Sequence, residues 1–130
     1  MPYRKRNGAW EFFLQMRGVD AETNPNRFGV FGGGIEGNKT PQQALLRELK
    51  EELTYIPRNY RYFSRFENAN RTSDLFIEEV GEDFEKDITV CEGQYGKFLT
   101  ADEVDSLGKD RMTPMVRVII LQLRDYLAKK

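Results

Sequence analysis

The sequence predicts an α/β fold in which a mixed β-sheet lies between helices. Extended segments and amphipathic helices follow one another in the order strands, helix, strands, helix. Most connections between the extended segments are short and polar, as in β-hairpins, so a regular array of βαβ units is not expected. The chain has 130 residues and contains no linker-like segment or internal repeat, which predicts a single domain over residues 1–130.

The first two strands are expected to form a hairpin. Residues 10–16 are rich in apolar side chains and follow a short extended segment near the N-terminus. Asn7 and Gly8 stand between them, and this pair is a strong hairpin signal because both residues tolerate a positive φ angle. A loop rich in Gly, Asp, Asn and Pro is expected at residues 18–26, and a third strand at residues 28–31.

The strongest helix signal begins at Thr40. This residue is a good N-cap, Pro41 suits the first helical position, and Gln43 completes a capping box. Pro57 marks the end of the helical pattern. The apolar side of this helix is expected to consist of Leu45, Leu46, Leu49 and Leu53.

The second half of the chain predicts four strands and two helices. The strands are expected at residues 60–67, 73–80, 88–91 and 97–99. Thr100 and Glu103 form a second capping box at the start of a short helix. A last helix is expected to begin at Thr113 and Pro114. Its apolar side should consist of Val116, Ile119, Ile120, Leu123 and Leu127.

The missing residue types exclude several kinds of active site. The chain has no histidine, which rules out a Ser-His-Asp triad, a histidine general base and a histidine-ligated metal. The single cysteine, Cys91, rules out an intrachain disulfide and a thiolate-rich metal site, and we interpret it as a small apolar strand residue. Catalysis must therefore use carboxylates, lysines, arginines, tyrosines, hydroxyl groups or an oxygen-ligated metal.

Charge and hydropathy limit the kinds of partner. The 20 basic and 21 acidic residues nearly cancel, so no overall field favours a nucleic acid or a membrane surface. No apolar stretch approaches the roughly 18 residues of a membrane span, and the N-terminus lacks a signal-peptide core. We therefore expect a cytoplasmic protein, and the sequence does not distinguish a monomer from a homodimer.

Three glutamates share one side of the helix that begins at Thr40. Glu48, Glu51 and Glu52 have the spacing i, i+3 and i+4, so they fall within an arc of roughly 100°. Their carboxylates repel one another unless a cation neutralises them. Oxygen ligands favour hard cations such as Mg²⁺ or Mn²⁺. A solvated acidic helix face is the alternative, and for three glutamates alone it would be the better interpretation.

The glycines before this helix favour the metal site. Gly32, Gly33 and Gly34 would let the backbone approach a bound ion or phosphate closely. Gly32, Gly34 and Gly37 also fit the pattern G-x-G-x-x-G of a dinucleotide-binding turn. That turn expects the helix to open on its third glycine in a parallel βαβ unit, whereas the helix signal here starts at Thr40. We rank the dinucleotide-binding interpretation below the metal site, and a mere flexible turn is a further alternative.

Gly33 and the run Arg47-Glu48-Leu49-Lys50-Glu51-Glu52 together resemble the signature of the Nudix hydrolase family. That signature is glycine, five residues, glutamate, seven residues, then Arg-Glu-apolar-x-Glu-Glu-x-Gly-apolar. The resemblance covers residues 33–55. The strand that ends in Arg17 and the approach to the glycines from Phe28 are also similar to the family.

The resemblance implies an α/β/α sandwich that hydrolyses a nucleoside diphosphate linked to another group, such as a nucleoside triphosphate or a nucleotide sugar, with Mg²⁺ or Mn²⁺. By position, Glu48 and Glu52 would be the principal metal ligands, with a contribution from Glu51. Arg47 would orient these glutamates. Glu92 is the candidate for an acidic residue from a later loop, and Glu48, Glu52 or Glu92 would accept the proton of the attacking water.

The remaining roles implied by the resemblance belong to the backbone and the substrate. A carbonyl of Gly32 or Gly33 would complete the metal site. Gly33 and Gly34 would lie against the substrate, Arg17 would contact a phosphate, and Phe28 would stack on a base. A surface glutamate in a turn is an equally good interpretation of Glu92.

Two residues depart from the family signature. Lys39 stands in place of the first glutamate, where it would repel Arg47. Thr54 stands in place of the closing glycine, and a β-branched residue disfavours a left-handed helix end. The helix is therefore expected to continue toward Tyr55 or Ile56.

Lys39 and Thr54 motivate a second functional hypothesis, a nucleotide-binding or regulatory Nudix domain with weak or lost catalysis. A third hypothesis, an RNA-end hydrolase, would need a basic surface that the balanced charge does not predict. The sequence does not identify the base, the sugar or the linked group.

Overall fold

The computed structural model of the protein describes residues 1–21, 24–31, 40–68, 71–91 and 93–129. In chain order the elements are β1 (Pro2–Arg6), β2 (Ala9–Met16), β3 (Phe28–Val30), α1 (Pro41–Leu53), β4 (Arg61–Asn68), β5 (Arg71–Glu79), the 3-10 helix η1 (Phe84–Lys86), β6 (Tyr95–Thr100), α2 (Ala101–Leu107), the 3-10 helix η2 (Lys109–Arg111) and α3 (Val116–Ala128). Within these residues, no helix is both long and apolar enough to cross a membrane.

The described strands form a mixed sheet in which β2 is central. Strand β6 runs antiparallel along one edge of β2 over residues 11–16. On the other edge, β1 pairs with residues 9–12 of β2 and β3 pairs with residues 14–16. Strand β1 also pairs in parallel with β5, where Tyr3 lies opposite Glu79, and β5 pairs antiparallel with β4. The mixed sheet is therefore confirmed.

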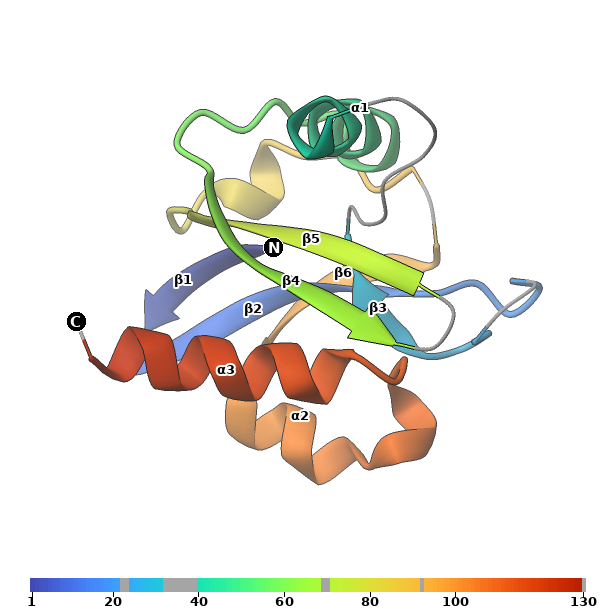
Figure 1. The fold of residues 1–130 in the computed structure, drawn as a ribbon, viewed down its shortest axis with the longest axis vertical. Coiled ribbons are helices and arrows are strands. Elements are labelled where there is room, and N and C mark those ends of the chain that lie inside the picture. The colour runs from blue at the N-terminus through green and yellow to red at the C-terminus, as the bar shows by residue number, and fades with distance from the viewer. Residues whose placement is uncertain (22–23, 32–39, 69–70, 92, 130) are drawn as a thin grey trace.

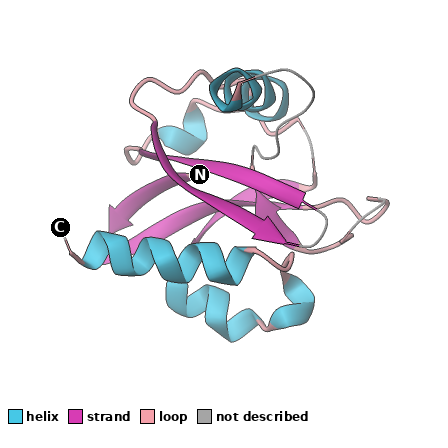
Figure 2. Ribbon diagram, in the orientation of Figure 1, coloured by secondary structure: helices cyan, strands magenta, loops and turns pink. Residues whose placement is uncertain are grey.

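Helices cover both faces of the sheet, as the α/β prediction requires. Helix α1 and η1 lie on one face, and α2 and α3 lie on the other (Figures 1 and 2). The side chains of β2 alternate between two apolar cores, with Phe12 and Leu14 in the core beneath α3 and Phe13 in the core beneath α1. The five apolar residues predicted for the last helix are all buried in the first of these cores.

Local signals predicted the first hairpin turn and the start of α2 correctly, but not the start of α3. Asn7 and Gly8 have φ angles of 52° and 81°, so the left-handed hairpin turn is confirmed. Thr100 caps α2 through the predicted box, in which its hydroxyl accepts from the Glu103 N–H at 3.1 Å. The last helix begins later than predicted, at Val116, because the Thr113 N–H is bonded to the carbonyl of Phe28 and a turn intervenes.

The predicted strand at residues 88–91 is wrong, and so is the interpretation of Cys91 as an apolar strand residue. The N–H groups of Thr89 and Cys91 donate to the carbonyls of Leu53 and Glu52, at 3.0 and 2.6 Å. These two N–H groups therefore bond to the C-terminal end of α1 and not to a neighbouring strand. Cys91 is exposed.

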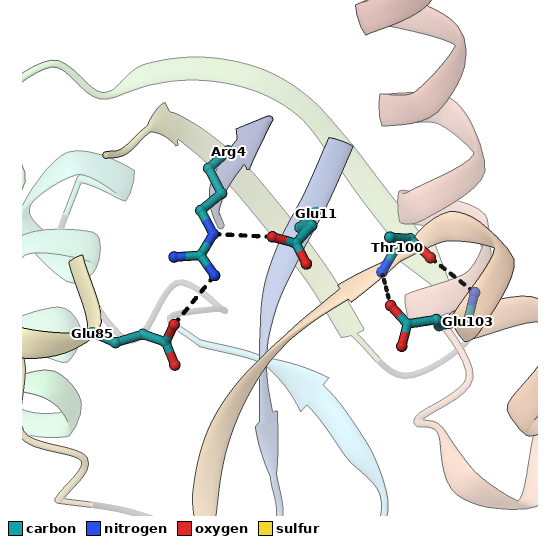
Figure 3. A network of polar contacts seen from close by, with 5 residues as sticks. All are labelled: Arg4, Glu11, Glu85, Thr100 and Glu103. Carbon is teal, nitrogen blue, oxygen red and sulfur yellow. Dashed lines mark hydrogen bonds and ion pairs between the residues drawn. The ribbon is translucent and has the colours of Figure 1, made fainter. Parts of the chain in front are cut away.

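A buried arginine on β1, Arg4, contacts side chains of β2, η1 and β6. The Arg4 side chain on β1 is 5% exposed, and its Nε lies 3.0 Å from Glu11 Oε1 on β2. A second nitrogen lies 3.2 Å from Glu85 on η1, and the guanidinium carbon is 3.8 Å from the centre of the Phe98 ring on β6. Figure 3 shows Arg4 reaching toward both carboxylates. No pattern in the sequence predicted this contact.

Candidate functional site

Helix α1 starts where the sequence predicts. The Thr40 hydroxyl accepts from the Gln43 N–H at 3.2 Å, and the Gln43 side chain accepts from the Thr40 N–H at the same distance. Pro41 is the first helical residue. Because this capping box is local, it fixes where the helix begins and hence the direction of every side chain that follows.

The apolar side of α1 is narrower than predicted. Leu45, Leu49 and Leu53 are buried together with Ala44, whereas Leu46 is 36% exposed. Leu46 was therefore wrongly assigned to the buried side. The acidic side lies beside the leucines as predicted, so the helix packs on the sheet without burying all three carboxylates.

The three predicted glutamates differ in exposure along the acidic side of α1. The Glu48 side chain is 13% exposed, and its Oε1 lies 3.8 Å from an Arg47 guanidinium nitrogen. Glu52, one turn further on, is half-buried, and Glu51 is exposed. Two carboxylates one turn apart therefore sit at the edge of the core, with a guanidinium beside them.

The carboxylates of Glu48 and Glu52 are oxygen donors that suit a hard cation, although α1 by itself does not supply all the ligands of a metal site. Within the described ranges, no group of three His, Cys, Asp or Glu side chains is arranged to hold a metal ion. Gly32, Gly33 and Glu92, three of the predicted donors, lie outside those ranges, as do Gly34 and Lys39. Mg²⁺ is commonly held by one or two carboxylates, with waters and substrate phosphates as its other ligands, and Glu48 and Glu52 suit that arrangement.

The end of α1 corrects the expectation that the helix continues toward Tyr55 or Ile56. The helix ends at Leu53, and Thr54 adopts the left-handed conformation, with φ 52° and ψ 42°. Its N–H donates to the Lys50 carbonyl at 3.0 Å, as in an αL cap. The last carbonyls of the helix are taken by Thr89 and Cys91, so tertiary contacts outweigh the preference of a β-branched residue.

The buried carboxylate of Glu78 on β5 accepts hydrogen bonds from the segment that follows α1. Glu78 is 7% exposed and accepts hydrogen bonds from the Tyr55 hydroxyl and from the N–H groups of Arg58 and Asn59, the latter two at 2.8 and 2.7 Å. Burial and this hydrogen bond raise the pKa of Tyr55. The tyrosine therefore stays a neutral donor to Glu78, and α1 is held against the sheet at its C-terminal end.

Replacing Thr54 by glycine is expected to stabilise the protein by about 0.5–1 kcal/mol. A left-handed residue with a Cβ costs roughly 1–2 kcal/mol, and glycine removes that cost while adding some entropy to the unfolded chain. Urea unfolding monitored by circular dichroism measures the change. Thr54→Ala is the matched control, because it keeps the Cβ, and it should show no gain. A lower stability of Thr54→Gly than of wild type would contradict this account.

Two of the residues expected to contact the substrate, Arg17 and Phe28, lie near the C-terminal end of β2. Arg17 directly follows β2 and is half-buried. Its side chain lies against Gly29, because the Arg17 Cδ is 3.5 Å from the position that a Cβ on Gly29 would take. Phe28 is only 4% exposed, so little of its ring is accessible for stacking on a base. Tyr95 meets the Phe28 ring edge-on, with centroids 6.2 Å apart, and is 43% exposed. The sequence carried no specific signal for Tyr95.

Known proteins resemble this chain over nearly its whole length. The family model described as NUDIX domain matches residues 3–118. The 8-oxo-dGTP diphosphatase of Escherichia coli (strain K12) is 31% identical over 121 residues, covering 92% of this chain and 90% of that protein. The NUDIX domain of Shewanella oneidensis NrtR, solved with ADP ribose, is similar with a TM-score of 0.73 at 14% identity, covering 97% of this chain and 83% of that one.

A second solved structure shows the same fold. The Ap4A hydrolase of C. elegans, solved as a binary complex, is similar with a TM-score of 0.67 at 18% identity, covering 99% of this chain and 94% of that one. At these identities, the structural likenesses bear on the sheet and its flanking helices only.

Proposed function

The chain belongs to the Nudix family of pyrophosphohydrolases, and from this premise we propose that it hydrolyses a phosphoanhydride bond of a nucleoside triphosphate with Mg²⁺ or Mn²⁺. The observation that carries this proposal is the acidic side of α1. There Glu48 and Glu52 lie one turn apart at the edge of the core, and Arg47 is beside Glu48. This pair of carboxylates suits a cation that also binds substrate phosphates.

The residues of the proposed site divide into metal ligands, an orienting arginine and a general base. Glu48 and Glu52 hold the cation, with Glu51 as a more exposed contributor. Arg47 keeps Glu48 in place through their contact. A bound metal would screen the phosphate charges and make the attacking water more acidic. Glu48, Glu52 or Glu92 accepts the proton of that water, a role that falls to a carboxylate because the chain has no histidine.

The names of the similar proteins support the substrate class. They mention 8-oxo-dGTP, ADP ribose and Ap4A, each of which contains a nucleoside attached to linked phosphates. We place a nucleoside triphosphate first, since the diphosphatase from E. coli is 31% identical to the chain, against 14% and 18% for the two solved structures. Arg17 would contact a phosphate, and the exposed Tyr95 ring beside Phe28 offers a surface for the base.

Metal-dependent turnover is the expected result of a substrate panel. The panel contains dGTP, 8-oxo-dGTP, Ap4A, ADP ribose and a nucleotide sugar, each with Mg²⁺, with Mn²⁺ and with chelator. Because a metal supplies several kcal/mol of transition-state stabilisation, chelation should lower the rate of nucleoside triphosphate hydrolysis by about 100-fold or more. Nucleoside monophosphate release is measured by chromatography, and readdition of Mg²⁺ serves as the control. Full activity in chelator would refute metal dependence.

A non-catalytic Nudix domain is the second candidate, and Lys39 favours it. The family signature has a glutamate there, and a lysine would repel Arg47. This candidate predicts that the protein binds one of the panel compounds, as measured by calorimetry, without releasing product at any metal concentration. The two candidates therefore give opposite results in the same assay.

A further inference from the structure

Gln94 joins two segments that are far apart in the sequence. Its backbone N–H donates to the Met16 carbonyl at 2.9 Å. Its side-chain nitrogen lies 3.1 Å from the Arg17 carbonyl and 2.7 Å from Asn26 Oδ1. One residue thus bonds to two consecutive carbonyls at the end of β2 and to a side chain across the following loop.

The loop that Gln94 contacts carries Arg17 at its base. The Arg17 N–H donates to the Arg27 carbonyl at 2.9 Å and closes the loop. Within it, the Gly18 carbonyl accepts from the N–H groups of Ala21 and Asn26, both at 3.3 Å. Asn26 has a φ angle of 57°, a conformation that asparagine tolerates better than most residues. The Gln94 side chain therefore bonds to Arg17 and Asn26, which lie near the two ends of the segment between β2 and β3.

The residues before and after Gln94 also restrict its position. Gly93 has a φ angle of 79°, and a Cβ there would lie 2.6 Å from the Met16 carbonyl oxygen and 2.9 Å from the Gln15 side chain. Only glycine permits this close approach. Tyr95, the next residue, pairs with Met16 as the first residue of β6. Gln94 is thus held at the junction of β2, β6 and the loop.

We propose that Gln94 is a positioning residue for the substrate, because it holds Arg17 and Asn26 against the start of β6. The proposal rests on the proposed function, in which Arg17 contacts a phosphate and Tyr95 faces the base. Gln94 is linked to both residues. Its side-chain nitrogen bonds to the Arg17 carbonyl, and Tyr95 follows it directly in the chain. Gln94 acts on the substrate through them and therefore on affinity more than on the chemical step.

The test is Gln94→Glu, which keeps the size of the side chain and replaces its NH₂ group by an oxygen. That oxygen would face the Arg17 carbonyl and Asn26 Oδ1, both of them acceptors. The expected result is a rise in KM for the nucleoside triphosphate of about tenfold, the size of two lost neutral hydrogen bonds, with kcat within about threefold of wild type. Gln94→Ala, which adds no charge, should also raise KM.

Gln122→Glu is the matched control, since Gln122 is exposed on α3 and undergoes the same chemical change. Amide hydrogen exchange of Ala21 and Asn26, measured by NMR without substrate, should be faster in Gln94→Glu and unchanged in the control. Unchanged KM and exchange would overturn the proposal, and so would a fall in kcat at constant KM. A wild type that turns over no nucleotide would refute the proposed function, and with it this role, whatever the exchange data show.

Discussion

Glu52→Gln is expected to lower kcat for nucleotide hydrolysis by roughly 10³-fold without unfolding the protein. Glu52 is half-buried on α1, one turn from Glu48, so its charge serves the proposed cation site. Glutamine keeps the size of the side chain but is a weaker metal ligand and accepts no proton at neutral pH. Loss of a general base alone typically costs 10²–10⁴-fold. Steady-state kinetics at saturating Mg²⁺ measure the effect.

The control for Glu52→Gln is Glu82→Gln, because Glu82 is exposed and lies outside the proposed site. Its kcat should match wild type. The thermal midpoints of both variants should stay close to wild type, which separates a loss of chemistry from a loss of fold. A Glu52→Gln protein with more than about a tenth of wild-type kcat would remove Glu52 from the catalytic site.

Arg4→Met is expected to cost about 3 kcal/mol of unfolding free energy. Arg4 is 5% exposed and is paired with Glu11, which is 16% exposed, and with the more exposed Glu85. Removing one partner of a buried pair leaves a carboxylate without its countercharge, and such losses are about 3–5 kcal/mol. We expect the lower end, because Glu85 can be solvated and methionine still packs on Phe98. Urea unfolding at neutral pH measures the change.

Two variants test whether the uncompensated charge is the cause. Arg124→Met removes an exposed pair with Asp125 and should change stability by less than about 0.5 kcal/mol. Adding Glu11→Leu to Arg4→Met should recover a large part of the loss, because no buried charge then remains unpaired between β1 and β2. If the double variant is less stable than Arg4→Met, packing and not charge explains the effect.

Nonlocal contacts account for most of what the sequence did not predict. Arg4 contacts Glu11 on the adjacent strand and Glu85 on η1, and neither contact follows from its residue type or its place in the sequence. Leu46 fits the helical period as well as Leu45, yet it is exposed, because only the docking of α1 on the sheet decides how wide a stripe is covered. Glu78 and Gln94 likewise act through donors and acceptors from distant segments.

The α/β class, the start of α1 and the acidic side that Glu48, Glu51 and Glu52 form could all be predicted from local sequence patterns. Capping and helical spacing act within a few residues, so they can be identified without the fold. The end of α1 and the conformation of residues 88–91 depend instead on contacts between distant segments. Thr54 and Cys91 are 37 residues apart in the chain, and contacts between their segments outweigh the local preference of threonine. Such contacts exist only once the sheet has brought the segments together.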